Sequence, residues 1–285
     1  MIPLPKKQTI LITGTSSGFG MLTAARLASK GHQVIAAMRN PGKQNVLLKE
    51  VKKRGGAVEV IYLDVTKPET IKKAFEKIVT KYEHLDVLIN NAGYGIGGFF
   101  EDLTEDEIRL QMETNFFGVQ NVTREALHIM RPRRSGKIIN ISSVAGFSTS
   151  PAFSAYNASK WALEAFSESL HHELKLFNIG VFLIEPGTYN TKIFHENARY
   201  AKHFDDQKSP YYPYSQKLKT RVLNYVTKDC HKDPEDIPAL IESIIDGRRK
   251  SFRNIPDIEG KMLYALRKFL PFPIYSRMIQ KALAI

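Results

Sequence analysis

Short runs of β-branched and aliphatic residues alternate with longer amphipathic stretches from residue 9 to about residue 185. The runs have the length and composition of buried strands, and they are Thr9–Thr13, Gln33–Met38, Val58–Leu63, Val87–Asn90, Lys137–Ser142 and Val181–Glu185. Between them, apolar residues recur at helical spacing, as at Ile71, Phe75 and Ile78. The alternation predicts an α/β fold with a doubly wound parallel sheet between two layers of helices.

Capping patterns and segment lengths predict the organisation of the chain. Helix starts are predicted where capping residues occur: Thr66 with Glu69, Thr104 with Glu107, and Asp233 before Pro234. No repeat or Pro/Gly/Ser linker divides the sequence, so we predict one domain over residues 1–256. It includes a long, aromatic-rich, irregular loop over residues 189–226, and a basic, apolar extension follows over residues 257–285. Loops of such length in a compact domain are usually functional.

The composition is typical of a globular protein from a reducing compartment. The chain has 285 residues, of which 43% are hydrophobic, and a single cysteine, Cys230. Cys230 has no partner for a disulfide and no Cys or His at metal-ligand spacing, so we expect no metal. Residues Met1–Lys7 lead into an apolar strand that is too short for a secretory signal or a membrane span. We therefore expect a cytoplasmic protein.

The formal net charge of +12 raises the question of a nucleic-acid partner. The basic residues, however, are mixed with acidic ones along helical stretches such as Lys49–Arg54 and Lys72–Lys81. Such mixing is typical of solvated helix faces. No nucleic-acid-binding motif accompanies the charge, so we expect no nucleic-acid partner.

A cluster of glycines follows the first predicted strand. The segment Gly14-Thr15-Ser16-Ser17-Gly18-Phe19-Gly20 leads into a predicted helix through Leu22, Ala25 and Leu27. Glycines allow the backbone to approach a phosphate group, whose charge then faces the unpaired N–H groups at the helix N-terminus. If the cluster stood alone, a tight strand-to-helix turn without a ligand would be the alternative.

Tyr156 and Lys160 lie four residues apart in a predicted helix, and Ser143 follows the fifth predicted strand. Side chains at this spacing project from one helix face. A nearby ammonium stabilises a phenolate, so we expect Lys160 to lower the pKa of Tyr156 from its ordinary value near 10. An isolated pair of this kind would be read as ordinary surface residues. Ser142 is an alternative to Ser143, but alternation along the strand points the two to opposite faces.

These motifs together resemble the short-chain dehydrogenase/reductase family over about residues 8 to 255. The glycine spacing Thr-Gly-x-x-x-Gly-x-Gly and Tyr156-Asn157-Ala158-Ser159-Lys160 match its two core motifs, and Ser143 lies at the family's usual distance upstream. Further matches occur at strand ends, and they are Asp64 with Val65, Asn91-Ala92-Gly93, Asn115, and Pro186-Gly187 with Thr191. Asp64 alone could equally be a cap at a strand end.

The resemblance implies a Rossmann-type fold with about seven strands and an oxidoreductase that interconverts a carbonyl and a secondary alcohol. It implies that Ser143 binds the substrate oxygen, Tyr156 exchanges the proton, Lys160 also binds the ribose, and Asn115 holds a water. The glycine segment, with Ser16, Ser17 and Phe19, and the matched strand ends would bind the cofactor. A homodimer or homotetramer is implied as well. A non-catalytic NADP(H)-sensing protein is the alternative, but such proteins commonly lose the tyrosine or the lysine.

The end of the second predicted strand bears on cofactor choice. An NAD enzyme normally places an acidic residue there to bind the ribose 2′-hydroxyl. Met38 occupies this place, and Arg39 follows it. A guanidinium can bind a 2′-phosphate with two hydrogen bonds. We therefore expect NADP(H), with NAD(H) as the alternative.

The substrate and the C-terminal extension are less defined by the sequence. Phe147, Phe153 and Tyr189 flank the catalytic motifs and indicate a hydrophobic substrate pocket, although core packing is an alternative for each. Within the family, Ala37-Met38-Arg39 and the extension are similar to the branch of 17β-hydroxysteroid dehydrogenase type 1 and retinol dehydrogenase-like proteins. A steroid, retinoid or aromatic carbonyl is the implied substrate.

The tail from Lys261 combines basic and apolar residues and would suit an anionic membrane surface. Because Pro271 and Pro273 interrupt any long amphipathic helix, we favour packing against the domain or a partner subunit.

Overall fold

The computed structural model describes residues 7–191 and 198–283. Residues 1–6 lie outside the described part. They make up most of the Met1–Lys7 segment, in which the sequence predicts no targeting signal. Residues 192–197 of the predicted loop and residues 284–285 also lie outside it. In the described residues no helix combines the length and the apolar character needed to cross a bilayer.

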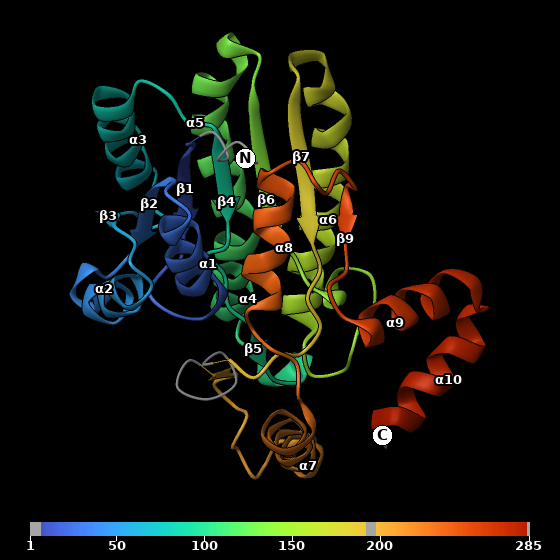
Figure 1. The fold of residues 1–285 in the computed structure, drawn as a ribbon. Coiled ribbons are helices and arrows are strands. Elements are labelled where there is room, and N and C mark those ends of the chain that lie inside the picture. Colours follow the sequence, from blue (N-terminus) through green and yellow to red (C-terminus); the bar gives the residue numbers. More distant parts are fainter. Residues whose placement is uncertain (1–6, 192–197, 284–285) are drawn as a thin grey trace.

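A parallel sheet of seven strands forms the centre of the molecule (Figure 1). Its strands, in spatial order, are β3 (Val58–Tyr62), β2 (Gln33–Met38), β1 (Thr9–Thr13), β4 (Val87–Asn90), β6 (Gly136–Ile141), β7 (Ile179–Ile184) and β9 (Arg253–Asn254). The central strands are buried on both faces, as Ile10, Leu11 and Ile12 show with 0% exposure. Burial on both faces explains why these strands read as continuous apolar runs. The doubly wound α/β fold predicted from the sequence is confirmed.

Helices cover both faces of the sheet and enclose two apolar cores. One face carries α1 (Gly18–Ser29), α2 (Gln44–Lys53) and α8 (Asp236–Ile245). The other carries α3 (Pro68–Tyr82), α5 (Gly118–Arg133) and α6 (Ser154–Leu174). The chain order reverses between β1 and β4. Ligands of such sheets bind at the carboxyl ends of the strands beside this reversal.

The predicted helix starts are correct at one of three positions. Thr104 forms a capping box with Glu107 at the start of α4 (Glu105–Met112), as predicted. In contrast, α3 starts at Pro68, and the Thr66 hydroxyl donates to the Asp64 carboxylate instead of capping the helix. Asp233 accepts a hydrogen bond in a turn before α8, whose own N-terminal cap is Glu235. In both cases an Asp-centred turn competes with the cap.

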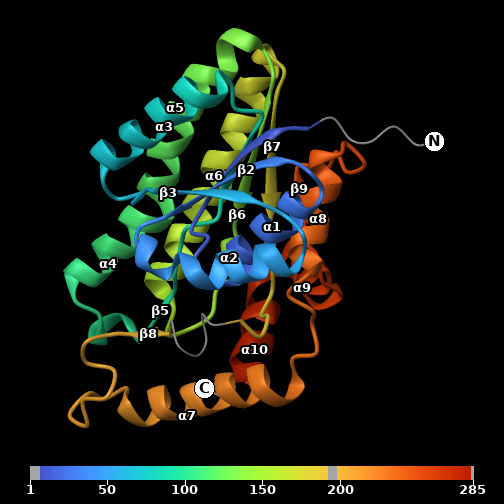
Figure 2. The same cartoon turned by 60° about the vertical axis from the view of Figure 1, so that its left-hand side comes forward.

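The region predicted as an irregular loop, residues 189–226, contains regular structure. It includes β8 (Arg199–Tyr200), which pairs with β5 (Ile96–Gly97), and α7 (Tyr212–Asn224). Helix α7 lies across the carboxyl end of the sheet (Figure 2). The extension forms α9 (Ile258–Phe269) and α10 (Phe272–Leu283).

Short helical turns complete the described fold. They are the 3₁₀ turns Pro41–Lys43, Phe100–Asp102, Val144–Gly146 and Lys175–Phe177, and the π-helical turns Glu113–Phe117 and Tyr225–Asp229.

Candidate active site

The glycine segment between β1 and α1 is packed tightly against the end of β4. Gly14 and Gly18 have φ angles of +72° and +57°, which only glycine adopts without strain. A Cβ at Gly20 would lie 2.6 Å from the Gly14 carbonyl oxygen, and one at Gly14 would lie 2.7 Å from the Ala92 Cα. Both positions therefore require glycine for steric reasons within the protein itself.

Asn91 and Thr13 join the ends of the two central strands. The Asn91 side-chain amide donates to the carbonyl oxygens of Thr13 (2.9 Å) and Gly14 (3.0 Å). The Thr13 hydroxyl accepts from the backbone N–H groups of Asn91 and Ala92, both at 3.0 Å. These hydrogen bonds hold the glycine segment in place, so Asn91 acts on the segment through its own side chain.

The residues present fit a dinucleotide phosphate group. The space around Gly18 is open, since a Cβ at this residue would meet no atom within 4 Å. The first N–H groups of α1 have no intrahelical acceptors and carry the positive end of the helix dipole. Ser16, Ser17 and Phe19, all partly exposed, surround this point. The segment therefore presents an anion-binding helix start beside the sheet reversal.

The other predicted cofactor residues lie at the same edge of the sheet. Asp64 uses one carboxylate oxygen to accept from the backbone and hydroxyl of Thr66, at 3.0 and 2.8 Å. Asp64 thus stabilises a turn at the end of a strand, which is the alternative that the sequence left open. Val65 is buried, and Gly118 of α5 packs against it. Gly93 is exposed after β4.

Arg39 extends into solvent from the end of β2, directly after Met38, which is 1% exposed. Burial raises the pKa of the phenol of Tyr94, which follows Gly93, and the charges of Arg199 and, more weakly, of Arg39 oppose this rise. Arg39 therefore lies on the side of the sheet edge where Asn91, Ala92 and Gly93 end β4.

Ser143, Tyr156 and Lys160 come together at the carboxyl end of β6. Ser143 lies two residues beyond the end of β6 in an extended conformation. Its hydroxyl accepts from the Ala145 N–H at 3.1 Å and donates to the Pro186 carbonyl oxygen at 3.4 Å. It also forms a hydrogen bond with Tyr156. Lys160 is 7% exposed and donates to the Ile141 carbonyl oxygen at 2.9 Å, with its Nζ 5.8 Å from the centre of the Tyr156 ring.

The electrostatics of this group differ from the expectation. Burial raises the pKa of Tyr156, and the Ser143 hydrogen bond opposes this rise only in part. The lowering that we expected from Lys160 is absent because Lys160 is itself buried, which lowers its pKa to about 8, and its ammonium faces Ile141. Tyr156 therefore keeps its proton at neutral pH in this structure.

Asn115 lies in the π-helical turn between α4 and α5, with 1% of its surface exposed. Its Oδ1 accepts from the Tyr94 N–H at 3.1 Å, and its Nδ2 donates to the Tyr94 carbonyl oxygen (2.9 Å) and to Ser159 Oγ (3.1 Å). Single π-helical turns often occur at functional sites. Asn115 thus ties the segment after β4 to the helix that carries Tyr156.

The segment after β7 is anchored by residues that the sequence reasoning missed. Gly187, following Pro186, donates its N–H to the Asp257 carboxylate at 3.1 Å. Asp257 also accepts from Lys232 Nζ at 2.9 Å and from the Gly260 N–H at 2.9 Å. The spacing of Asp257 and Gly260 at the start of α9 is a capping signal that the sequence contains. Thr191 is partly exposed at the end of the described segment.

An apolar cavity of about 100 Å³ lies over Tyr156. Its walls are formed by glycines of β5 and its neighbours, by aromatic residues and by one face of α7, and they include Gly95, Gly97, Phe153, Tyr200, Phe204, Leu218, Lys219 and Val222. A Cβ at Gly95 would lie 3.4 Å from the Tyr156 ring, so the glycine keeps this ring accessible.

Two of the three predicted substrate residues lie elsewhere. Phe153 lines the cavity over Tyr156. Phe147 packs edge-on against Tyr264 of α9, with ring centres 5.0 Å apart. Tyr189 is 1% exposed and packs edge-on against Phe19, so it belongs to the core. For Phe147 and Tyr189 core packing, the alternative that the sequence left open, prevails.

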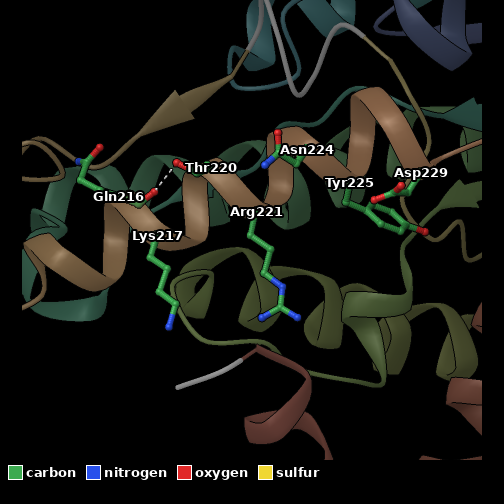
Figure 3. A pocket seen from close by; sticks show the side chains of 7 residues that line it. All are labelled: Gln216, Lys217, Thr220, Arg221, Asn224, Tyr225 and Asp229. Atoms are coloured by element: carbon green, nitrogen blue, oxygen red, sulfur yellow. Dashed lines mark hydrogen bonds between the residues drawn. The ribbon is translucent and has the colours of Figure 1, made fainter.

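Helix α7 separates the apolar cavity from a polar hollow. Ser215, Leu218 and Val222 face the cavity, whereas an open hollow of about 680 Å³ lies on the other side. Figure 3 shows its lining residues, among which Lys217 and Arg221 extend from α7 to the same side. The two faces differ in polarity as expected for an amphipathic helix that covers an apolar site.

Two buried carboxyl groups lie beneath Lys160. Glu164, one turn further along α6, and Glu185, at the end of β7, each accept from Arg253 at 2.6 Å. Burial raises the pKa of both groups, that of Glu185 to about 8, and the nearby Glu164 contributes to the rise at Glu185. One guanidinium thus faces two carboxyl groups, of which one keeps its proton near neutral pH. No group of three or more His, Cys, Asp or Glu in the described part of the chain is arranged to hold a metal ion.

Comparisons with known proteins agree with this geometry. The model of the short chain dehydrogenase family matches residues 8–201. A 3-ketodihydrosphingosine reductase from Bacteroides thetaiotaomicron is 38% identical, and the alignment covers 98% of this chain and 97% of the relative. The name of this relative does not point to the 17β-hydroxysteroid and retinol dehydrogenase branch that we expected.

Solved structures show the same fold with both nicotinamide cofactors. A short chain dehydrogenase/reductase from Burkholderia phymatum in complex with NAD has a TM-score of 0.79 at 25% identity, covering 94% of this chain and 95% of its own. A single-residue variant of actinorhodin polyketide ketoreductase with NADPH has a TM-score of 0.74 at 26% identity, with 87% and 95% covered. An NAD(P) cofactor is typical of this fold.

Proposed function

The chain belongs to the short-chain dehydrogenase/reductase family of NAD(P)-dependent oxidoreductases, and we propose that it uses NADP(H) to reduce a hydrophobic ketone. The observation that carries the proposal is the position of Tyr156. Its ring lines an apolar cavity, its hydroxyl is hydrogen-bonded to Ser143, and Lys160 lies one turn further on the same helix. A proton donor is thus placed where an apolar carbonyl compound can bind.

Tyr156, Ser143 and Lys160 have different roles at the substrate oxygen. The cofactor, when bound, supplies the hydride. Tyr156 keeps its proton at neutral pH because burial raises its pKa, so it can donate this proton to the oxygen as a general acid. The Ser143 hydroxyl binds the same oxygen. Lys160, with its pKa of about 8, is mostly charged at neutral pH and favours the phenolate that remains.

Asn115 acts as a positioning residue in this proposal. The family resemblance assigns it a water of the proton relay, but its amide is engaged by the Tyr94 backbone and Ser159. Through these contacts it fixes the segment after β4 against α6. The cofactor would be held by the helix start at Gly18, by Lys160 at the ribose, and by the ends of β3, β4 and β7.

The preference for NADP(H) rests on Arg39, whose exposed guanidinium follows β2 where an acidic residue would favour NAD. We expect Arg39→Ser to raise the KM for NADPH by about tenfold or more, in line with the loss of a charge-assisted hydrogen bond, and to leave the KM for NADH unchanged. Lys43→Ser, which removes an exposed cation four residues away, should change neither. Equal kcat/KM of the unmodified enzyme with NADH and NADPH would favour the alternative, an NAD-dependent alcohol dehydrogenase.

The apolar cavity and the similarity to a 3-ketodihydrosphingosine reductase support a long-chain ketone as substrate. The cavity of about 100 Å³ is smaller than ligand pockets of roughly 300 Å³ or more, so a long chain requires the cavity to widen. We expect kcat/KM to be highest for long-chain 3-ketones in a panel that also holds steroid, retinal, aromatic and small polar ketones. A preference for small polar ketones would refute the hydrophobic substrate.

Two substitutions on α7 test whether the cavity binds this chain. Val222→Lys places a charge in the cavity and should raise the KM for a long-chain ketone. Thr220→Lys places the same charge on the exposed opposite face and should leave this KM unchanged. An equal effect of both substitutions would place the substrate elsewhere.

A further inference from the structure

Helix α9 exposes an apolar stripe. Ile258, Met262, Ala265 and Phe269 are spaced by four, three and four residues, so they share one face of the helix. Ile258 is 81% exposed, Met262 61% and Phe269 77%. The opposite side of the helix contacts the domain, where Tyr264 packs against Phe147. The usual orientation of a surface helix, with its apolar face inward, is therefore reversed at this stripe.

Helix α10 continues the exposed apolar surface around a corner. Phe272 is 64% exposed and Ile274 54%, whereas Tyr275 is buried and hydrogen-bonded to Ser148. Arg267 lies 5.7 Å from the Phe272 ring centre and 5.4 Å from that of Tyr275, which fixes the corner. Figure 1 shows both helices projecting beyond the layers of the α/β domain.

Nearly all charges of this surface are positive, and the acidic side chain of α9, Glu259, is paired with Lys232 at 2.7 Å. The segment from residue 260 to residue 285 has no acidic residue. Its cations are Lys261, Arg267, Lys268, Arg277 and Lys281. Lys261 and Lys268 are exposed, lie seven residues apart and therefore border the α9 stripe on one side. Apolar residues bordered by lysines are the pattern of helices that lie in a membrane interface.

We propose that the exposed surface of α9 and α10 docks onto an anionic membrane surface. The apolar stripe would enter the interface, and the lysines and arginines would contact the lipid headgroups. A second copy of the chain fits less well, because pairing of equivalent surfaces would bring like charges together. The surface is also much smaller than the roughly 20 to 30 residues a side of a stable protein interface.

The position of the surface connects it to the active site. Helix α9 begins at the Asp257 cap, which also holds Gly187 beside the site, and it packs on the turn that follows Ser143. Pro271 lies between the two helices and Pro273 in the first turn of α10, where proline is tolerated, so the prolines do not prevent an amphipathic surface. The inference does not rest on the identity of the substrate, although an apolar ketone dissolved in a membrane would reach the site from this side.

The test is co-sedimentation of the full chain with vesicles of phosphatidylcholine, with or without phosphatidylglycerol. We expect binding to the anionic vesicles and much weaker binding to phosphatidylcholine alone. A Lys or Arg near an anionic membrane contributes about 1 kcal/mol, a factor of about five, so Lys261→Glu with Lys268→Glu should lower the partition coefficient about 25-fold or more. Lys49→Glu with Lys53→Glu on α2, both exposed, changes the net charge equally and should have little effect.

A second variant separates insertion from charge attraction. Met262→Ser with Phe269→Ser should also lower binding to anionic vesicles. All three double variants should keep the unfolding temperature and the turnover of a water-soluble ketone. Equal losses for the α9 and α2 lysine variants, or no binding of the unmodified chain, would overturn the proposal. So would a dimer in size-exclusion chromatography that Met262→Ser with Phe269→Ser converts to a monomer, because a second copy would then cover the surface.

Discussion

Asp257 offers a quantitative test of how the structure holds its active-site edge. Its carboxylate, which is 7% exposed, accepts from the backbone of Gly187 and Gly260 and from Lys232. Asp257→Ala removes the N-terminal cap of α9, which costs about 1 kcal/mol. It also leaves the Gly187 N–H without its acceptor, which costs about 1–3 kcal/mol. Lys232 keeps Glu259 as a partner at 2.7 Å. The free energy of unfolding should therefore fall by about 2–4 kcal/mol.

Chemical denaturation followed by circular dichroism measures this loss, and cofactor titration measures its effect on the site. Because Gly187 is held in place by Asp257, we expect weaker cofactor binding as well as lower stability. Glu259→Gln is the matched control, since it removes the other carboxylate bound to Lys232. Because Glu259 is 57% exposed, its loss should cost less than about 1 kcal/mol. If Asp257→Ala and Glu259→Gln had equally small effects, the anchoring role of Asp257 would be refuted.

Three further substitutions test other parts of the site. Gly20→Ala places a Cβ 2.6 Å from the Gly14 carbonyl oxygen and should weaken cofactor binding about tenfold or more, as expected for overpacking of about 1–3 kcal/mol. Gly42→Ala, on an exposed turn, should leave cofactor binding unchanged. Titration of cofactor fluorescence distinguishes the two variants. Ser143→Ala removes the hydrogen bond that lowers the pKa of Tyr156, so the loss of reduction activity at high pH, where Tyr156 loses its proton, should move to higher pH. Glu185 is protonated up to about pH 8 in the folded chain but only to about 4.5 when unfolded, so its raised pKa costs stability as pH rises between these values. Glu185→Gln should make the unfolding temperature less dependent on pH in this window, and an unchanged slope would contradict the buried carboxyl pair.

Much of the fold could be predicted because buried parallel strands have a clear sequence pattern. Thr9–Thr13, Gln33–Met38 and Val87–Asn90 have the predicted bounds, since each is a continuous apolar run between polar residues. The strands Ile96–Gly97 and Arg199–Tyr200 could not be predicted, because a two-residue pairing between segments so far apart in the chain leaves no periodicity. Helix α7 was missed because its aromatic residues resemble an irregular loop.

The part of the candidate site that could be predicted consists of motif residues at the ends of strands. Tyr156, Lys160 and Ser143 come together because β6 and α6 meet at one edge of the sheet. The direction of the Tyr156 pKa was wrong because burial of Lys160, a tertiary effect, cannot be read from their spacing. Tyr189 and Phe147 were assigned to the substrate because they are aromatic and flank the catalytic motifs, and only packing shows that they lie against Phe19 and Tyr264.

The exchange of Tyr156 for phenylalanine tests the central claim most directly, because it removes one hydroxyl and leaves the ring in the cavity. The rate of NADPH oxidation with a reducible ketone should fall by about 100-fold or more, while NADPH titration gives a nearly unchanged dissociation constant. Tyr62→Phe, at an exposed position, should leave both values unchanged. A Tyr156→Phe enzyme with near-normal turnover would contradict the assignment of Tyr156 as the proton donor.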